Sequence, residues 1–196
     1  MARTADPGKR DAILLAARAV FLERGYLQTR MSDIAERAGV ATGTLYLYFD
    51  SKEALVLALS EQFFEKLAEA IAPATKHQDM RAAIADAVRL SLAHIVEHQD
   101  LLRLTHLDAG LAGALRRPLP ARREYQTRLA TQLTWWMAQG QVRRYDPLIL
   151  AELITGLVER AAEVCLLQGG GNTARYEVEV VRMLQHALLP YQEESP

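Results

Sequence analysis

Apolar side chains recur at helical spacing along most of the chain, and runs of β-branched residues are scarce. In the first such stretch the apolar positions follow i, i+1, i+4, i+7 and i+8, as in Ile13 to Phe21. Asp6-Pro7 before it is typical of a helix start, and Gly25 after it is typical of a helix end. The pattern therefore predicts an amphipathic helix that begins near Pro7 and ends near Arg24.

Two short helices joined by a tight turn are predicted between Met31 and Lys52. Ile34, Ala35 and Ala38 share one face of the first helix, for which Thr29 is the candidate N-cap. Gly39 then supplies a residue that tolerates positive φ. In the second helix, residues 42–49, the apolar side chains at positions 45 and 49 lie four apart on a buried face.

Six further helices are expected beyond this turn. Asp50 begins a long helix, with Glu53 as its capping-box partner, and Pro73 ends it. The remaining five are expected at about residues 79–98, 100–109, 121–138, 147–168 and 172–189. A glycine- and proline-rich break at residues 110–120 is typical of a loop and a boundary. The chain is thus expected to contain about nine helices.

Composition narrows the class of protein. The chain has 196 residues, of which 50% are hydrophobic and 24% charged, enough for a packed core in one or two domains. Leu and Ala dominate, which favours an all-α fold. The formal net charge is −1. Up to Lys52 there are eight Lys and Arg against six Asp and Glu, so nucleic-acid binding must depend on where the charges lie.

The compartment is expected to be the cytoplasm. The single Cys165 cannot form an internal disulfide, which fits a reducing environment. No apolar run approaches the roughly 18 residues that span a bilayer, so no membrane partner is expected. The N-terminal segment lacks the apolar core of a signal peptide.

The helix at residues 42–49 has an unusual surface for a core element. Small polar residues lie at its start, and Tyr46 and Tyr48 lie off its buried face. Such a helix suits the major groove of DNA, with its tip toward the bases and its phenols toward the phosphates. A helical hairpin with exposed tyrosines, without DNA affinity, is the alternative at this point.

The same stretch resembles the DNA-binding signature of the TetR family of bacterial transcriptional regulators, over roughly the first third of the chain. The matching segments are Ile34-Ala35, Ala38-Gly39-Val40, Gly43-Thr44-Leu45-Tyr46, Tyr48-Phe49 and Ser51-Lys52-Glu53-Ala54-Leu55. Ala41 stands where Ser is common in the family, and Leu47 stands where a polar residue is common. The resemblance implies DNA contacts by Ala41, Thr42, Gly43, Thr44, Tyr46, Leu47, Tyr48 and Lys52. Arg30 stands where the family often has Ser or Thr, and its place at a helix N-terminus predicts a contact with a phosphate.

The resemblance also implies an architecture and a mode of action. Residues 6–52 would form a three-helix helix-turn-helix domain, and residues 53–196 a helical ligand-binding and dimerisation domain. The helices at about 147–168 and 172–189 would pair two chains into a homodimer. The protein would then be a repressor that binds a palindromic operator in double-stranded DNA and is released by a small, largely apolar effector.

Apolar side chains in the C-terminal part provide a candidate effector pocket. The candidates are Phe64, Val88, Leu92, Arg103, Leu104, His106, Leu107, Tyr125, Leu129, Trp135 and Trp136. Adjacent Trp135 and Trp136 cannot both face one side of a helix. His94 and His98 are four apart, a spacing that can chelate a metal, but no acidic or Cys partner at a telling spacing supports a metal site. Neither a metal nor another cofactor is therefore expected.

The sequence also bears on two other classes of function. An enzyme is not expected, because the chain lacks a Gly-x-Ser-x-Gly elbow, a metal-binding box and a phosphate loop. An all-helical adaptor that binds only protein remains the alternative to a DNA-binding regulator.

Overall fold

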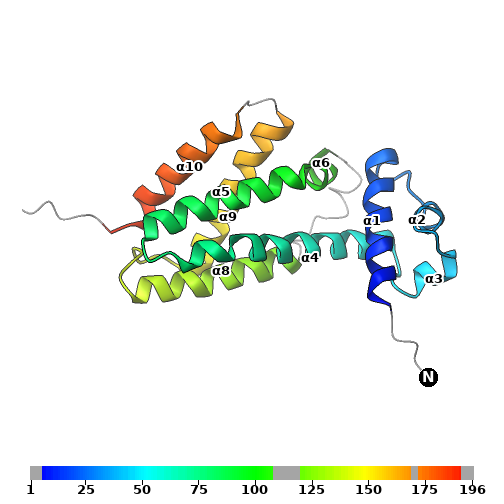
Figure 1. Cartoon of the computed structure of the whole chain (residues 1–196), viewed down its shortest axis with the longest axis horizontal. Coiled ribbons are helices and arrows are strands. Elements are labelled where there is room, and N and C mark those ends of the chain that lie inside the picture. The colour runs from blue at the N-terminus through cyan, green and yellow to red at the C-terminus, as the bar shows by residue number, and fades with distance from the viewer. Residues whose placement is uncertain (1–5, 108–119, 169–171, 191–196) are drawn as a thin grey trace, which may run out of the picture. The chain divides into compact units, whose positions relative to one another are not determined.

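The computed structural model describes residues 6–107, 120–168 and 172–190, except for the side chains of residues 104–107. Within these ranges the chain folds into nine α-helices and one 3-10 helix, η1, with no strand, which confirms the all-α prediction (Figure 1). The elements are α1 Pro7–Arg24, α2 Met31–Arg37, α3 Thr42–Tyr46, α4 Lys52–Ile71, η1 Ala72–Lys76, α5 Met80–Glu97, α6 Gln99–Leu107, α8 Pro120–Ala138, α9 Pro147–Leu167 and α10 Thr173–Leu188.

The chain divides into two compact units. The first comprises Met1–Phe63 with Asp100–Ala121, and the second comprises Phe64–Gln99 with Arg122–Pro196. The boundary falls inside α4, so one continuous helix contributes its first half to one unit and its second half to the other.

A single apolar core holds the first unit together. Ile13 of α1, Ile34 of α2, Leu45 of α3 and Leu55 of α4 are all fully buried in one cluster. The helix α2 packs against both α1 and α3, as Figure 1 shows. Four short amphipathic segments therefore share one core, which fixes the small helix α3 on a rigid base.

The start of α2 differs from the prediction. Thr29 is not its N-cap: this side chain is buried, and its Oγ1 donates a hydrogen bond to the carbonyl of Gly25 at 2.7 Å. Arg30 is the N-cap, and its backbone N–H donates to the Asp33 carboxylate at 2.9 Å. The cap is thus supplied by a carboxylate inside the first turn, which the preference for Ser, Thr, Asp or Asn at the cap position does not reveal.

Two other helix limits were predicted incorrectly. The helix α3 ends at Tyr46, before Phe49, and α4 begins at Lys52 rather than at Asp50. The Ser51 hydroxyl accepts a hydrogen bond from the Ala54 N–H at 3.2 Å, so Ser51 takes the capping role that was assigned to Asp50. Helix ends depend on such local side-chain contacts, which periodicity does not specify.

The second unit is built around α5. This helix packs against η1, α9 and α10, and α10 also packs against α9 (Figure 1). Asp79, Asp146 and Asn172 cap α5, α9 and α10, each accepting a hydrogen bond from a backbone N–H in the first turn. Asp146 and Pro147 begin α9 in the same way as Asp6 and Pro7 begin α1. The helix α4 ends at Ile71, just before Pro73 as expected, and Pro73 lies in the first turn of η1.

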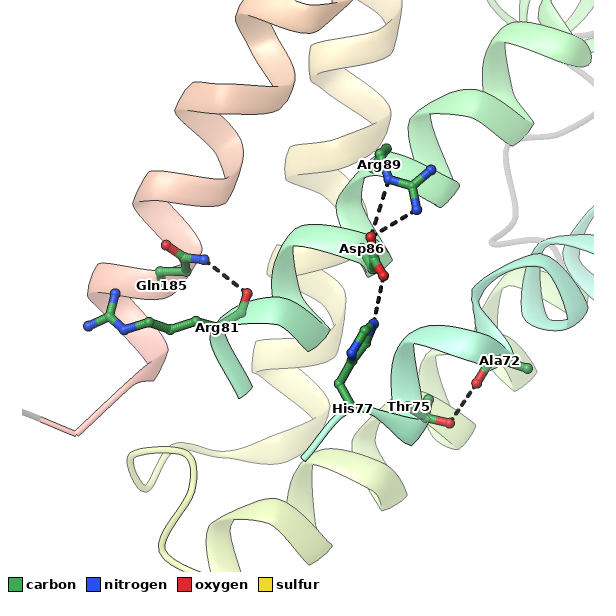
Figure 2. Close-up of polar contacts among 7 residues, drawn as sticks. All are labelled: Ala72, Thr75, His77, Arg81, Asp86, Arg89 and Gln185. Atoms are coloured by element: carbon green, nitrogen blue, oxygen red, sulfur yellow. Dashed lines mark hydrogen bonds and ion pairs between the residues drawn. The ribbon is translucent and has the colours of Figure 1, made fainter. Parts of the chain in front are cut away.

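Polar side chains join the elements at the surface of this unit (Figure 2). His77, just after η1, forms a 2.6 Å contact with the Asp86 carboxylate of α5, and Arg89 donates to the same carboxylate at 2.8 Å. These hydrogen bonds, from Arg89 first and His77 second, lower the pKa of Asp86 below its usual value. The Gln185 amide of α10 donates to the Arg81 carbonyl at 2.9 Å, linking α10 to α5.

Among the residues that the structure describes, no helix is both long and apolar enough to cross a membrane.

Candidate DNA-binding site and effector cavity

The exposed surface of α3 is the candidate DNA-binding site. Leu45 and Phe49 are buried beneath it, 0% and 5% exposed. On the opposite side Tyr46 is 48% and Leu47 is 81% exposed. Exposed side chains on a helix whose base is fixed in a core are suited to insertion into a groove. Ala41, Thr42 and Gly43 are also exposed, and Thr44 is half-buried.

The turn between α2 and α3 fixes their relative orientation. Gly39 has a φ of 66°, a left-handed conformation that a residue with a Cβ adopts only with strain. The Val40 N–H then donates to the Ala35 carbonyl at 3.0 Å, which closes the turn onto the end of α2. The glycine that the sequence suggested for this position is therefore required by the backbone.

The two tyrosines differ in their surroundings. Tyr46 is exposed, whereas the Tyr48 hydroxyl accepts a hydrogen bond from the Asp6 backbone N–H at 3.1 Å. Asp6 is also the N-cap of α1, accepting from Gly8 at 3.0 Å. The Tyr48 hydroxyl keeps its own hydrogen, so it can donate to a phosphate while it holds the start of α1.

The cations of this unit fall into two groups. Arg24 pairs with Asp33 at 3.1 Å, and Arg37 pairs with Glu23 at 2.8 Å. Lys9 and Arg30 are exposed and form no ion pair within the described part of the chain. Internal pairing thus neutralises some cations and leaves these two available for phosphates.

Lys52 has a structural contact that its sequence position did not reveal. Its ammonium donates to the Tyr26 carbonyl at 2.7 Å and lies 4.6 Å from the centre of the Tyr26 ring. It therefore holds the segment between α1 and α2 in place. An ammonium has three donors, so this contact does not preclude a bond to DNA.

A cavity of about 290 Å³ lies within the second unit. Its wall is mostly apolar and comes from the end of α4, η1, α5, α8, α9 and α10. Four of the candidate pocket residues line it: Val88, Tyr125, Leu129 and Trp136. A mostly apolar cavity of this size with a few polar groups is suited to a small ligand.

Other candidates lie elsewhere. Trp135 is 55% exposed and does not line the cavity, while Phe64 and Leu92 are buried outside the cavity wall. Phe64 still supports the wall, because its ring centroid lies 5.6 Å from that of Tyr125. Arg103 is exposed and belongs to the first unit. The side chains of Leu104, His106 and Leu107 lie outside the described residues.

The polar part of the wall was largely missed by sequence reasoning. Ser91 and Thr155 are buried and line the cavity, and the Thr155 hydroxyl donates to the Ala151 carbonyl at 2.7 Å. Gln132 lines it from α8. Helical spacing offers a signal for Ser91 and Gln132, since each lies three residues after a predicted lining residue, Val88 and Leu129.

Charge at the cavity wall is paired. Glu159 lines the cavity, and the Arg122 guanidinium donates to both oxygens of its carboxylate at 3.1 and 2.8 Å. Burial, and then the negative charge of Glu159, raise the pKa of Tyr125 to about 12. Tyr125 is therefore a neutral hydrogen-bonding group at neutral pH.

An exposed apolar surface covers parts of α9 and α10, the helices predicted to form the dimer interface. Its members are more than half exposed: Leu148, Ile149 and Leu153 on α9, and Val178 and Met183 on α10. Leu153 is the most exposed of the five, at 65%. We call these five residues the α9–α10 face.

Comparison with known proteins decides the family. A family model described as "Bacterial regulatory proteins, tetR family" matches residues 13–59, which span α1 to the first part of α4. The HTH-type transcriptional regulator RutR of Escherichia coli (strain K12) is 30% identical over 161 residues, 79% of this chain and 74% of that protein. The chain belongs to the TetR family. This TetR-family chain is thus a transcriptional regulator with a DNA-binding helix-turn-helix.

Other relatives agree with this assignment. YdgC, an HTH-type transcriptional regulator of Bacillus subtilis (strain 168), is 26% identical over 186 residues, 92% of the TetR-family chain and 93% of YdgC. These relatives are regulators of transcription, not enzymes.

Solved structures share the fold. A TetR-family regulator from Rhodococcus sp. has a TM-score of 0.77 at 23% identity, covering 91% of this chain and 97% of that one. FadR from Bacillus subtilis, solved in complex with stearoyl-CoA, has a TM-score of 0.70 at 24% identity. The match covers 89% of this chain and 96% of FadR. At these identities the likeness concerns the fold alone.

Proposed function

We propose that this regulator is a repressor that binds a palindromic operator as a homodimer and is released by a compact, largely apolar effector. The observation that supports it best is the exposed tip of α3 above the buried Leu45 and Phe49. A rigid helix with an exposed, uncharged tip can read base edges without large rearrangement.

We assign DNA contacts by the chemistry of each side chain. Residues 6–52 form the DNA-binding domain in this proposal. Thr42, Gly43, Thr44 and Leu47, with Ala41 at the N-cap, approach the bases, where Leu47 can contact a thymine methyl. The phosphate contacts are assigned to Arg30, Tyr46, Tyr48 and Lys52.

The operator symmetry requires two copies of α3. Half-sites one helical turn apart, about 34–36 Å, are read by a two-fold symmetric dimer. The α9–α10 face supports this part of the proposal, because five apolar side chains more than half exposed are costly to leave in water. Residues 53–196 form the ligand-binding and dimerisation domain, and a two-fold axis would bring this face against its own copy.

The cavity supports the effector part of the proposal. Its volume of about 290 Å³ lies near the lower end of the roughly 300–1,000 Å³ range of ligand pockets, which favours a compact effector. Ser91, Gln132 and the neutral Tyr125 hydroxyl offer hydrogen bonds on a mostly apolar wall. The two charged residues of the wall are each paired, Glu159 with Arg122 and Arg128 with Glu124, so we expect a neutral effector rather than a strongly charged one.

The link between effector and operator is assigned to α4. Its last turns line the cavity through Leu67, Ala68 and Ile71, and its first turns belong to the core that holds α3. A ligand that binds one position of α4 better than another would separate the two recognition helices and lower operator affinity.

Fluorescence anisotropy tests this function. Labelled duplexes from the region upstream of the protein's own gene are titrated with the full-length chain over a salt series, with a scrambled duplex as control. We expect specific binding by a dimer, with log K falling by about 0.9 per phosphate neutralised for each unit of log salt. Equal affinity for both duplexes, or no binding to either, would leave a helical adaptor as the better description.

Release by effector is tested in the same assay. Neutral apolar compounds are added to the preformed complex, with stearoyl-CoA included because FadR of Bacillus subtilis was solved with it. We expect a compact neutral compound to lower the anisotropy and the long acyl thioester to have little effect. If stearoyl-CoA were the only compound tested that released the protein from DNA, the proposal of a compact effector would be contradicted.

A further inference from the structure

The last turn of α5 carries three side chains that are all potential metal ligands. His94, Glu97 and His98 occupy positions i, i+3 and i+4, which places them on one face of the helix. One ligand atom from each lies within 4.8 Å of the other two. No other group of three His, Cys, Asp or Glu in the described part of the chain brings its ligand atoms so close.

The two histidine rings lie side by side. Their centroids are 4.3 Å apart with an interplanar angle of 33°. The His98 Nδ1 lies 3.0 Å from the His94 carbonyl oxygen, which can only accept, so Nδ1 donates the hydrogen bond. In a neutral ring this fixes the tautomer that carries the lone pair on Nε2, as in histidines that bind metal through Nε2.

The position on the helix also favours a cation. The unpaired carbonyl groups at a helix C-terminus carry partial negative charge, which stabilises positive charge in the last turn. His94 is buried, 6% exposed, whereas Glu97 is exposed and His98 is half-buried. One ligand is therefore held firmly by the core, and the cluster remains open to solvent at Glu97.

We propose that His94, Glu97 and His98 form a binding site for a divalent transition-metal ion of the Zn²⁺ class. Two imidazole nitrogens and one carboxylate oxygen are a donor set typical of Zn²⁺ sites with three protein ligands, and water completes the coordination. Small rotations of the Glu97 and His98 side chains bring the ligand atoms from their present separation to coordination distance.

The site adjoins the effector cavity. Ser91 and Ile95, which flank His94 on α5, both line the cavity. A metal ion at this turn would fix the end of α5 beside the cavity wall. The site stands on its own geometry and does not depend on the proposed repressor activity.

Cobalt and zinc binding test the proposal directly. The tag-free full-length protein is dialysed against chelator and titrated with Co²⁺, whose visible absorption reports nitrogen and oxygen ligands, and Zn²⁺ is then added as competitor. We expect one equivalent of metal per chain with micromolar affinity. His98→Gln and Glu97→Gln, each removing one ligand, should weaken Zn²⁺ binding by about tenfold or more.

His77→Gln is the matched control. His77 also contacts a carboxylate, that of Asp86, but belongs to no group of three ligands among the described residues. The Zn²⁺ affinity of the His77→Gln variant should equal that of the wild type. The proposal would be overturned if the wild type bound no Co²⁺ with ligand-field bands. It would also be overturned if Glu97→Gln and His98→Gln kept the full Zn²⁺ affinity, or if His77→Gln lost as much affinity as they do. Circular dichroism checks the fold of each variant, and Glu97, being exposed, gives a test that does not disturb the core.

Discussion

Arg18 of α1 donates two hydrogen bonds to the carboxylate of Asp100, a residue 82 positions away in the first turn of α6. The pair joins Nε to one carboxylate oxygen and Nη2 to the other. Both side chains are about three-quarters buried, at 27% and 28% exposed. The start of α6 is thereby attached to the helix that supports the DNA-binding core.

Removing one member of this pair should destabilise the first unit. We expect Asp100→Asn to lower the free energy of unfolding by about 1.5–3 kcal/mol, the range for hydrogen bonds to a charged group. Urea denaturation at neutral pH measures the change. Asp50→Asn, at an exposed carboxylate of the same unit, is the control and should have little effect.

The stabilisation that Asp100 provides should depend on pH. Burial raises the pKa of Asp100, but the hydrogen bonds and charge of Arg18 lower it more, so the pKa lies below its ordinary value of 3.8. A depressed carboxyl pKa contributes stability that is complete above the unfolded value, near 3.8, and is lost as the pH falls through the folded value. The difference in unfolding free energy between wild type and Asp100→Asn should therefore shrink below about pH 3.8. If the difference in unfolding free energy between the two proteins stays constant as the pH falls below about 3.8, the ion pair is contradicted.

Mutations in α3 and in the two residues that follow it should distinguish contacts to bases from contacts to phosphates. Tyr48→Phe removes a hydroxyl and should weaken binding to every operator variant by a similar factor, about threefold to tenfold, or ~1 kcal/mol. Thr44→Ala and Leu47→Ala should instead change the ranking of operator variants by about 1–3 kcal/mol at one base pair. Anisotropy titrations on a panel of single-base variants measure both. If Thr44→Ala and Leu47→Ala lowered the affinity for every operator variant by the same factor, neither residue would be a base contact.

Tryptophan fluorescence should distinguish the two adjacent indoles. Trp136 lines the cavity, whereas Trp135 is 55% exposed. An effector that enters the cavity should therefore quench or shift the emission of Trp136. We expect Trp135→Phe to keep the ligand-dependent change and Trp136→Phe to lose it, and the reverse result would place the ligand outside the cavity.

The α9–α10 face should control the oligomeric state. Leu153→Glu introduces a charge on this face at a side chain that is 65% exposed, so the monomer should still fold while self-association fails. Leu15→Glu on α1, at a leucine that is 70% exposed, is the matched control. Light scattering coupled to gel filtration should give a monomer for the first variant and a dimer for the second. A dimer for Leu153→Glu would require a different interface.

The sequence by itself determined the helices and their buried faces. The spacing of Ile13, Leu14, Ala17, Val20 and Phe21 specified α1 because side chains three and four apart share a helix face. The motif between Ile34 and Leu55 identified the DNA-binding unit, since the turn needs a glycine and the core needs those apolar positions. Proline and aspartate marked the start of α1 and α9 for equally local reasons.

Only the tertiary structure decided which side chains meet across long separations. Spacing placed Trp135 and Trp136 on different sides of α8, but the neighbouring helices determined that Trp136 lines the cavity. The contacts of Lys52 with Tyr26, of Tyr48 with Asp6 and of Arg18 with Asp100 join residues 26, 42 and 82 positions apart. Periodicity describes which face of a helix is buried, whereas the partner on that face depends on how whole helices pack.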